Sequence, residues 1–347
     1  MRDFLANQES DISLDNSVLL ITGGTGSFGR AFAQTVLENF NLKKLIIFSR
    51  DELKQFEMQT DPVFEPHLDK LRFLIGDVRE SERLELAFRG VDYVVHAAAL
   101  KQVPAAEYNP FECIKTNVNG AENVVNAAIK TDVKMVIALS TDKAANPINL
   151  YGASKLASDK IFIAGQRVAA EYGPKFAVVR YGNVVNSRGS VVPFFQQLVR
   201  NGADWLPITD RRMTRFLITI EQGVAFVLSS FGLIREGGEM FVPKIPSARI
   251  TDIAEFIAPN IPQREVGIRP GEKLHEVMIT EDDSRLTVEL PDRYVVRPAF
   301  WRPNSSIAGA VSVSDRFSYS SDANEEWVDK GTLEDMLNGR NSISFPT

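Results

Sequence analysis

The sequence SVLLITGGTGSFG at residues 17–29 leads directly into RAFAQTVLENF at residues 30–40. The apolar run VLLIT predicts a buried strand, and the second stretch has the spacing of an amphipathic helix. Gly23, Gly26 and Gly29 lie between them as GxxGxxG. Glycine suits such a turn because the chain bends sharply, a pyrophosphate can approach bare backbone, and the first helical N–H groups are free to bind it. A purely structural glycine turn is the alternative interpretation.

Outward from this turn, short β-branched runs alternate with amphipathic stretches between Val18 and Val184. The further predicted strands are KKLIIFSR, LRFLIGDV, DYVVHAAA, KMVIALST and KFAVVRYGNV. Near-continuous apolar strands separated by helices are typical of a parallel sheet with both faces covered. The fold class is therefore predicted as α/β, a Rossmann-like doubly wound sheet, with ligands at the carboxyl ends of its strands.

Beyond Asn183 the alternation breaks up into turn-rich segments. We expect residues 1–182 to form the nucleotide-binding domain and residues 183–347 to form mainly a smaller α/β substrate lobe with a C-terminal tail. The predicted helix from Ile220 to Leu233 is apolar enough to return to the sheet, so the boundary is expected to be interleaved, with residues 217–236 belonging to the first domain.

Composition excludes several classes of function. The chain has 347 residues, 44% of them hydrophobic, and a net charge of −6 without a basic block, which argues against nucleic-acid binding. It contains no run of about eighteen apolar residues and no apolar leader, so a cytoplasmic protein without membrane contact is expected. The single cysteine, Cys113, has no Cys/His cluster around it, so neither a metal site nor redox chemistry is predicted.

The second strand is followed by Ser49-Arg50-Asp51-Glu52-Leu53-Lys54. An acidic residue at this point binds the ribose 2'-hydroxyl in NAD sites, whereas cations suit the 2'-phosphate of NADP. Arg50 and Lys54 favour NADP, while Asp51 leaves NAD open. Asp77-Val78 closes the third strand and is expected to flank the adenine, with a simple strand-end cap as the alternative.

Tyr151 is the only one of seven tyrosines with a lysine four residues later. The pair Tyr151 and Lys155 would lie on one helical face at the ligand end of the fifth strand. Tyrosine titrates near pH ~10 when unperturbed, so the Tyr151 pKa must fall for it to act as a base near neutrality. A neighbouring ammonium and a cationic nicotinamide would lower it, and Tyr151 could then take the proton from a substrate hydroxyl.

TGGTGSFG, HAAALKQVPAAEYNP, LSTDKAANPINLYGASK, RYGNVVNSRGSVVPFF, DRRMTRF and RPGEKLHEVM occur in this order along the chain. Together they resemble the inverting UDP-N-acetylglucosamine 4,6-dehydratases that open pseudaminic acid synthesis, within the extended short-chain dehydrogenase/reductase superfamily. The resemblance runs from about Ser17 to about Leu337. Its most specific element is Thr141-Asp142-Lys143, because relatives that act on dTDP-glucose or GDP-mannose typically carry Thr-Asp-Glu there.

The resemblance implies oxidation at C4, elimination of water across C5 and C6, return of hydride to C6, and reprotonation of C5 from the opposite face, which gives an L-arabino product. Tyr151, Lys155, Asp142, Lys143 and Thr141 are the catalytic residues it implies. Asp142 would be the acid for the C6 hydroxyl, Thr141 would bind the C4 oxygen, and Lys143 would be the C5 base, which requires an uncharged amine in a desolvated pocket. An exposed turn ion pair is the alternative for Asp142 and Lys143.

The remaining expected contacts come from the same motifs, and a homo-oligomer, either a dimer or a hexamer, is also implied. The expected cofactor contacts are Gly23, Thr25, Gly26, Ser27, Phe28, Gly29, Ser49, Arg50, Asp51, Lys54, Asp77, Val78, Ala97, Ala98, Ala99, Lys101, Tyr151 and Lys155. The expected UDP-sugar contacts are Lys101, Asn183, Arg188, Val192, Pro193, Thr209, Arg212, Met213, Arg215, Arg269 and Glu272. Arginine forks suit phosphate oxygens, although Arg212 and Arg215 could also be surface cations.

Three alternatives stay open. The first is a dehydratase that retains the C5 configuration, the second a capsule-type dehydratase and 5-epimerase, and the third an NADP-binding regulator without turnover. Two departures from the family pattern, Gln102 and Asn186, affect the expected substrate preference: family members often have histidine and glycine there. His96 is expected to pack beneath the nicotinamide and receives no catalytic role.

Overall fold

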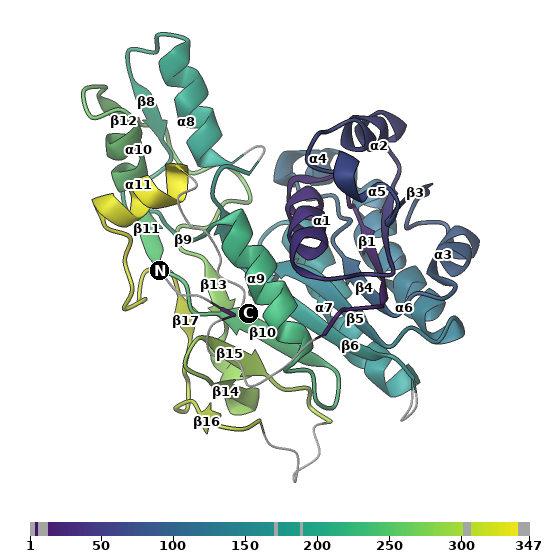
Figure 1. Ribbon diagram of the computed structural model, residues 1–347. Coiled ribbons are helices and arrows are strands. Elements are labelled where there is room, and N and C mark those ends of the chain that lie inside the picture. Colours follow the sequence, from purple (N-terminus) through teal and green to yellow (C-terminus); the bar gives the residue numbers. More distant parts are fainter. Residues whose placement is uncertain (1–3, 6–12, 170–172, 188–189, 301–306, 339–347) are drawn as a thin grey trace.

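A ten-stranded sheet runs through the chain, in the order β16-β14-β15-β10-β6-β5-β4-β1-β2-β3 (Figure 1). The computed structural model describes residues 4–5, 13–169, 173–187, 190–300 and 307–338. Seven neighbouring strands are parallel: β1 (Val18–Thr22), β2 (Lys44–Ser49), β3 (Leu71–Ile75), β4 (Tyr93–His96), β5 (Met135–Thr141), β6 (Lys175–Tyr181) and β10 (Glu239–Pro243). The predicted α/β doubly wound fold is confirmed, because each of the six predicted runs forms one of these strands.

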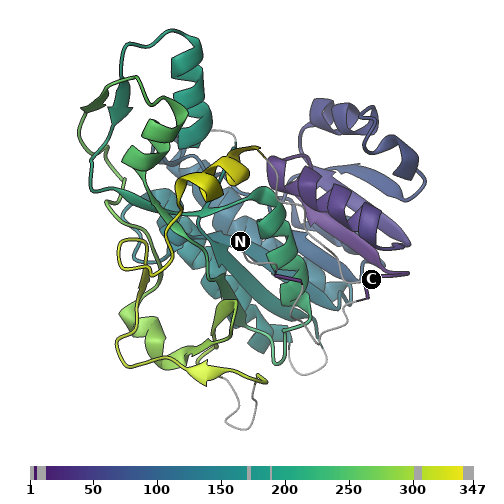
Figure 2. The same ribbon diagram turned by 60° about the vertical axis from the view of Figure 1, so that its left-hand side comes forward.

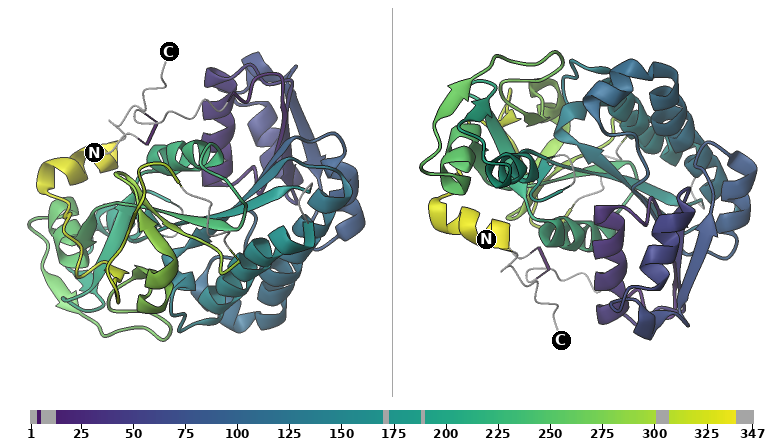
Figure 3. Two further views of the ribbon diagram at one scale, coloured as in Figure 1. Left: turned by 90° about the horizontal axis from the view of Figure 1, so that it is seen from below. Right: turned by 90° about the horizontal axis from the view of Figure 1, so that it is seen from above.

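Helices cover both faces of the parallel sheet. α1 and α9 pack together on one face, and α3, α6 and α7 pack in a row on the other (Figure 3). The bounds are α1 (Ser27–Asn39), α2 (Glu52–Gln59), α3 (Ser81–Phe88), α4 (Val103–Tyr108), α5 (Pro110–Ile114), α6 (Gly120–Lys130), α7 (Leu150–Ala169) and α9 (Ile220–Phe231). Short helical turns are η1 (Glu65–His67), η2 (Lys115–Asn119), η3 (Asp142–Ala144) and η4 (Glu281–Leu286). This two-sided cover explains why the strands are apolar on both faces.

Local chemistry explains where α9 begins. The Thr219 hydroxyl accepts the N–H of Gln222, and the Gln222 side chain accepts the N–H of Thr219, which is a capping box. Nearly all of α9 is buried, between α1 and the strands β5 and β6. A helix from the second half of the sequence therefore supports the strands that carry the first half's functional residues.

The C-terminal half also extends the sheet, which the sequence patterns did not predict. β15 (Arg293–Val296) pairs antiparallel with β10, followed by β14 (Thr287–Glu289) and β16 (Val311–Ser312). Each of these strands has four residues or fewer, which is too short for an alternation of polar and apolar residues to be recognised in the sequence. The sheet thus joins both halves of the chain.

A second, smaller hydrophobic core lies beside the sheet (Figure 2). It contains α8 (Val191–Arg200), α10 (Ile250–Ile257) and α11 (Lys330–Asn338), with short strands between them. The short strands are β7 (Asn183–Val184), β8 (Leu206–Ile208), β9 (Thr214–Ile218), β11 (Ser247–Arg249), β12 (Gln263–Glu265), β13 (Val277–Ile279) and β17 (Tyr319–Ser320). They form small sheets of two or three strands that carry side chains toward the ligand end of the large sheet.

No helix in the described part of the chain combines the length and apolar character needed to cross a membrane.

Arg293 ties the two halves together and yields a stability prediction. Its side chain is fully buried, donates to Asp292 and to the hydroxyls of Ser229 and Ser230, and lies 4.5 Å from the centre of the Phe226 ring. Replacing Arg293 with alanine should lower the free energy of unfolding by about 3 kcal/mol or more, because a buried, fully paired group is lost and a cavity remains.

Urea denaturation measures this loss, with Arg249→Ala as the matched control. Arg249 also stacks on an aromatic ring, that of Trp327, but its side chain is 57% exposed and its carboxylate partner is 3.9 Å away. The control should cost less than about 1 kcal/mol. Equal losses in the two variants would contradict the role assigned to Arg293.

Candidate active site

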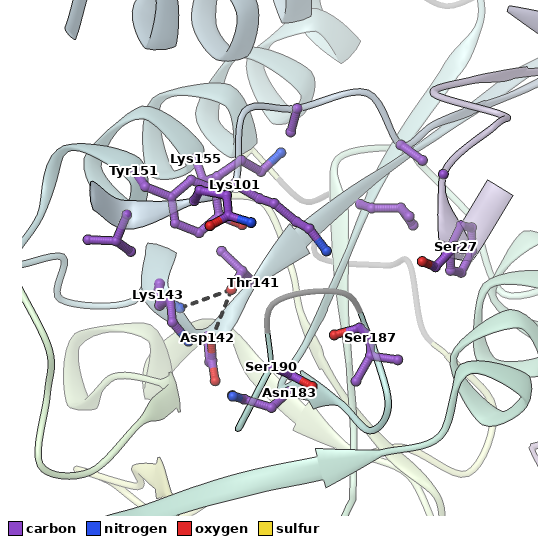
Figure 4. Close-up of a pocket in the computed structure, with 18 of the residues that line it drawn as sticks. Ser27, Lys101, Thr141, Asp142, Lys143, Tyr151, Lys155, Asn183, Ser187 and Ser190 are labelled. Carbon is purple, nitrogen blue, oxygen red and sulfur yellow. Dashed lines mark hydrogen bonds and ion pairs between the residues drawn. The ribbon is translucent and has the colours of Figure 1, made fainter. Parts of the chain in front are cut away.

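A large cavity of about 1340 Å³ lies along the carboxyl ends of the parallel strands. The segments that follow β1, β2, β3, β4, β5 and β6 all contribute to its wall, and residues of α8, β9 and the loop before β13 close the other side. Figure 4 shows Thr141, Asp142, Lys143 and Tyr151 gathered in one part of the cavity and Ser27 in another. Two parts of a ligand could therefore be held at separate positions in one space.

Two glycines of the first turn are required by close approach. Gly23 has a φ of +67°, and a Cβ on it would lie 2.9 Å from the Ala98 backbone. A Cβ on Gly29 would lie 2.5 Å from the backbone of Gly24. The N-cap residue of α1, Gly26, makes no side-chain cap, so the first N–H groups of this 13-residue helix are free to bind an anion at the cavity wall.

The charged side chains that follow β2 form ion pairs. Asp51 caps α2, because its carboxylate accepts the N–H of Lys54 and pairs with the Lys54 ammonium at 2.5 Å. These contacts hold the pKa of Asp51 below its ordinary value. Arg50 pairs with Asp77 at 3.3 Å while its own side chain stays 53% exposed. The Asp51 carboxylate is thus already paired with Lys54, whereas the Arg50 guanidinium remains accessible to a ligand.

Tyr151 and Lys155 both lie buried on α7, on the wall of the cavity. The helix approaches η3 so closely that a Cβ on Gly152 would lie 2.2 Å from the carbonyl oxygen of Lys143. Only glycine fits between these two elements, which explains the second letter of YGASK. The motif places the tyrosine and the Asp142–Lys143 turn against each other.

Burial shifts the pKa values of both residues in the protein alone. Burial raises the pKa of Tyr151 to about 12, and the Lys143 charge and the Thr141 hydroxyl oppose this only in part. Burial lowers the pKa of Lys155, with Asp159 opposing. Tyr151 is therefore a neutral phenol in the protein alone, and the positive charge that would lower its pKa must come from a bound cation.

Asp142 and Lys143 form an ion pair inside the cavity. The Lys143 Nζ is 3.0 Å from Asp142 Oδ1, and the Asp142 side chain is 1% exposed, which rules out an exposed turn. The Thr141 hydroxyl donates to the same Oδ1 at 2.9 Å. The second oxygen, Asp142 Oδ2, is buried without a hydrogen-bond partner among the described residues, as expected of a group that meets a ligand.

A third member of this cluster, Glu276, was not predicted. Its Oε1 lies 3.1 Å from Lys143 Nζ and 3.7 Å from Nε of Arg215. Burial acts to lower the pKa of Lys143, but the charges of Asp142 and Glu276 outweigh it and raise the pKa above its ordinary value. The pocket thus supplies two carboxylates along with its desolvation, and the uncharged amine that the C5-base role requires stays a prediction for the complex with cofactor and substrate.

The predicted residues can now be placed. All of the predicted cofactor contacts line the cavity, as do Asn183, Pro193, Thr209, Met213, Arg215, Arg269 and Glu272. Arg188 lies outside the described residues. Val192 is instead buried in the second core, while its neighbours Val191 and Pro193 face the cavity. Arg212 is not part of the wall either, because its side chain is 72% exposed and donates from Nε and Nη2 to Asp210.

His96 is a packed residue, as expected. It is buried, its Nδ1 lies 2.8 Å from the Thr22 hydroxyl, and its ring contacts Phe162. Burial, with the Lys155 charge second, lowers its pKa to about 3. A neutral imidazole with these contacts supports the end of β4 from inside the sheet.

The two departures from the family pattern have different structural settings. Asn186 has a φ of +60°, a conformation that favours glycine and that asparagine tolerates better than most residues. Its side chain also donates to the carbonyl of Leu337 in α11. Gln102 is exposed on the wall of the cavity, where a change of side chain can alter substrate contacts directly.

A family of proteins and several individual relatives match most of this chain. The profile of the family described as "Polysaccharide biosynthesis protein" matches residues 19–298. The chain is 54% identical to a UDP-N-acetylglucosamine 4,6-dehydratase (inverting) of Campylobacter jejuni, over 92% of this chain and 97% of that protein. It is 43% identical to a UDP-glucose 4-epimerase of Rickettsia canadensis, over 80% of this chain and 82% of that protein.

Among solved structures, the X-ray structure of Pen from Bacillus thuringiensis is similar to this chain, with a TM-score of 0.85 and 34% identity. The similarity covers 95% of this chain and 99% of that chain, so both the parallel sheet and the smaller lobe are shared.

Proposed function

The chain belongs to the polysaccharide biosynthesis protein family, and we propose that within it the protein is a UDP-N-acetylglucosamine 4,6-dehydratase that inverts C5. The observation that carries this proposal is the ion pair of the buried Asp142 with the partly buried Lys143, in the same cavity as Tyr151 and Lys155. A 4-epimerase needs only oxidation and reduction at C4. An acid and an amine beside the tyrosine are the additional groups that elimination across C5 and C6 requires.

The residues around the first turn fit a nicotinamide dinucleotide. The close approaches at Gly23 and Gly29 and the free N–H groups of α1 would hold its pyrophosphate, and Asp77 and Val78 line the wall where its adenine would lie. Such a cofactor would supply the hydride acceptor at C4 and the hydride donor at C6.

The chain's own groups supply the proton transfers. Tyr151 would accept the C4 hydroxyl proton, with the Lys155 ammonium nearby, while Thr141 would hold the C4 oxygen. The C4 ketone acidifies the C5 proton, which Lys143 would remove. Asp142 would protonate the departing C6 oxygen, so that the leaving group is water. Asp142 and Lys143 are in contact, so a proton can pass directly between them.

We further propose that NADP is preferred over NAD, on the accessible Arg50 guanidinium and the engaged Asp51 carboxylate. Arg50→Ala should weaken NADP binding by about ten- to a hundredfold, because a charged hydrogen bond to the 2'-phosphate is lost, and should leave NAD binding nearly unchanged. Calorimetric titration with each dinucleotide measures this. Arg79→Ala is the matched control, since Arg79 binds the same Asp77 but is not part of the cavity wall. Equal losses for both dinucleotides would contradict the assignment.

The decisive experiment uses purified protein and UDP-N-acetylglucosamine. We expect loss of one water from the sugar nucleotide by mass spectrometry, and proton NMR at early times should show the L-arabino configuration at C5. A D-xylo first product would indicate the retaining alternative. A product of unchanged mass but inverted at C4 would indicate an epimerase. Cofactor binding without any turnover would indicate the regulator.

The wider setting is also a proposal based on the resemblance. The product would enter pseudaminic acid synthesis and then a surface glycan such as that of flagellin. The enzyme would act in the cytoplasm as a homo-oligomer, a dimer or a hexamer, which sedimentation analysis distinguishes.

A further inference from the structure

Glu276 is a buried carboxylate aimed at the ammonium of Lys143. Its side chain is 2% exposed, and its Oε1 lies 3.1 Å from Lys143 Nζ. The other oxygen, Oε2, is buried without a hydrogen-bond partner in the described part of the chain. Burying a carboxylate is costly unless its charge is compensated, so this residue is held in place for the cation that it faces.

The backbone of Glu276 is held independently of its side chain. Its N–H donates to Ser321 Oγ at 2.9 Å, and the N–H of Ser321 donates to its carbonyl at 2.8 Å. Two residues further along, the carbonyl of Met278 accepts the buried guanidinium of Arg180 at 2.9 Å. Changing only the charge of the Glu276 side chain should therefore leave this segment in position.

Lys143 is surrounded by charged and titratable groups from several elements. Asp142 precedes it in η3, Glu276 and Lys273 come from the loop before β13, Arg215 comes from β9, and Tyr151 comes from α7. Two carboxylates contact the single Lys143 ammonium, whereas Arg215 stands farther off, 3.7 Å from Glu276. The local arrangement favours the charged amine, which is the state that exists after a proton has been taken from carbon.

We propose, resting on the function proposed above, that Glu276 is a positioning residue that aims the Lys143 amine and strengthens it as the C5 base. Transfer of one proton from Lys143 Nζ to Asp142, 3.0 Å away, breaks an N–H bond and forms an O–H bond. This leaves Lys143 as a neutral amine, which can take the C5 proton, and Asp142 as a carboxylic acid, which can protonate the C6 oxygen. No proton is exchanged with solvent in this step.

The amine then forms an N–H bond to the C5 proton, and the C–H electron pair passes into the enolate of the C4 ketone. As the C5–C6 double bond forms, the C6–O bond breaks and Asp142 gives its proton to the leaving oxygen. The pair returns to ammonium and carboxylate. Glu276 stays charged throughout and stabilises the ammonium that is formed, so the amine is a stronger base with Glu276 than without it.

The test is Glu276→Gln, which keeps the size of the side chain and removes its charge. We expect kcat for dehydration to fall about tenfold, because the Lys143 amine loses the charged contact at 3.1 Å that aims it at C5. The isotope effect from C5 deuteration should increase. Single-turnover formation of the reduced nicotinamide should keep its wild-type rate, since Lys143 stays charged beside Tyr151 in this variant and takes no proton during oxidation at C4.

The pH dependence gives a second readout. The alkaline limb of kcat reports loss of the Lys143 proton, and the charge of Glu276, 3.1 Å away, makes that proton harder to remove. In Glu276→Gln the alkaline limb should move to lower pH by about one pH unit. Glu276→Asp, which keeps the charge, should retain most of the wild-type profile.

Glu239→Gln is the matched control, because Glu239 is a buried carboxylate on β10 that does not line the cavity. It should leave the profile, the isotope effect and kcat unchanged. A readout that needs no turnover is labelling of Lys143 with acetic anhydride, followed by mass spectrometry over a pH series. The reactive amine should appear at lower pH in Glu276→Gln than in the wild type or in the control.

A folded Glu276→Gln variant with wild-type labelling and pH profiles overturns the inference, whatever its kcat. An equal fall in the rates of C4 oxidation and of dehydration also overturns the inference, because a merely structural role would slow both steps alike. Failure of the wild type to dehydrate UDP-N-acetylglucosamine overturns the proposed function instead. The labelling shift would then still decide whether Glu276 controls the Lys143 amine.

Discussion

Tyr151→Phe is expected to lower the rate of the first oxidation by about a thousandfold, because it removes the hydroxyl proposed to take the C4 hydroxyl proton. The ring stays, so the buried packing of α7 is kept. The measurement is the absorbance of reduced nicotinamide in a single turnover with UDP-N-acetylglucosamine. No reduced cofactor should accumulate, and no dehydrated product should form.

Burial explains why this effect should be large. The pKa of Tyr151 is raised to about 12 in the protein alone, so the phenol loses its proton only when cations are close. Oxidation should become faster as the pH rises toward that pKa, and a bound cationic nicotinamide should move the rise to lower pH. The control is Tyr93→Phe, the same chemical change at the start of β4, away from the cavity. Oxidation at a wild-type rate in Tyr151→Phe would refute its role.

Lys143→Ala is expected to stop dehydration at a different point. Cofactor binding and C4 oxidation should continue, while water loss should fall by about a thousandfold, since the base for C5 is gone. Reduced nicotinamide should therefore accumulate together with a 4-keto sugar that has not lost water. Mass spectrometry of the quenched mixture and the nicotinamide absorbance together measure this separation of steps.

The matched control is Lys134→Ala, which also removes a lysine paired with a carboxylate, Asp92 at 2.9 Å, but at a 62% exposed position outside the cavity. Its turnover should match that of the wild type. Dehydration at an unchanged rate in Lys143→Ala would remove this residue from the mechanism and leave Asp142 to be considered with another base.

The nucleotide half of the site was predictable because it is local in sequence. Strand, turn and helix follow one another at residues 18–39, and the end of each parallel strand faces the same edge of the sheet. The predicted contacts in these segments therefore line the cavity together. The pair Tyr151 and Lys155 was predictable for the same reason, since four residues is one helical turn.

Fewer of the residues predicted in the smaller lobe line the cavity. Val192 and Arg212 were chosen from motifs whose neighbours do line the cavity, but the direction of each side chain depends on how α8 and the turn before β9 pack. Glu276 lies within the quoted RPGEKLHEVM, yet nothing in the letters distinguishes it from Glu272. What distinguishes Glu276 is its contact with Lys143, a residue more than a hundred positions away along the chain.

The sequence alone therefore determined the α/β fold, the glycine turn after the first strand and the spacing of Tyr151 and Lys155, because these depend on periodicity and on spacings within one or two elements. Only the tertiary structure decided the charge state of the site. Whether Lys143 is an ammonium or an amine, and whether Tyr151 is a phenol, depends on burial and on carboxylates brought within a few ångströms from distant segments. Electrostatic energies follow distance in space, which separation along the chain does not reveal.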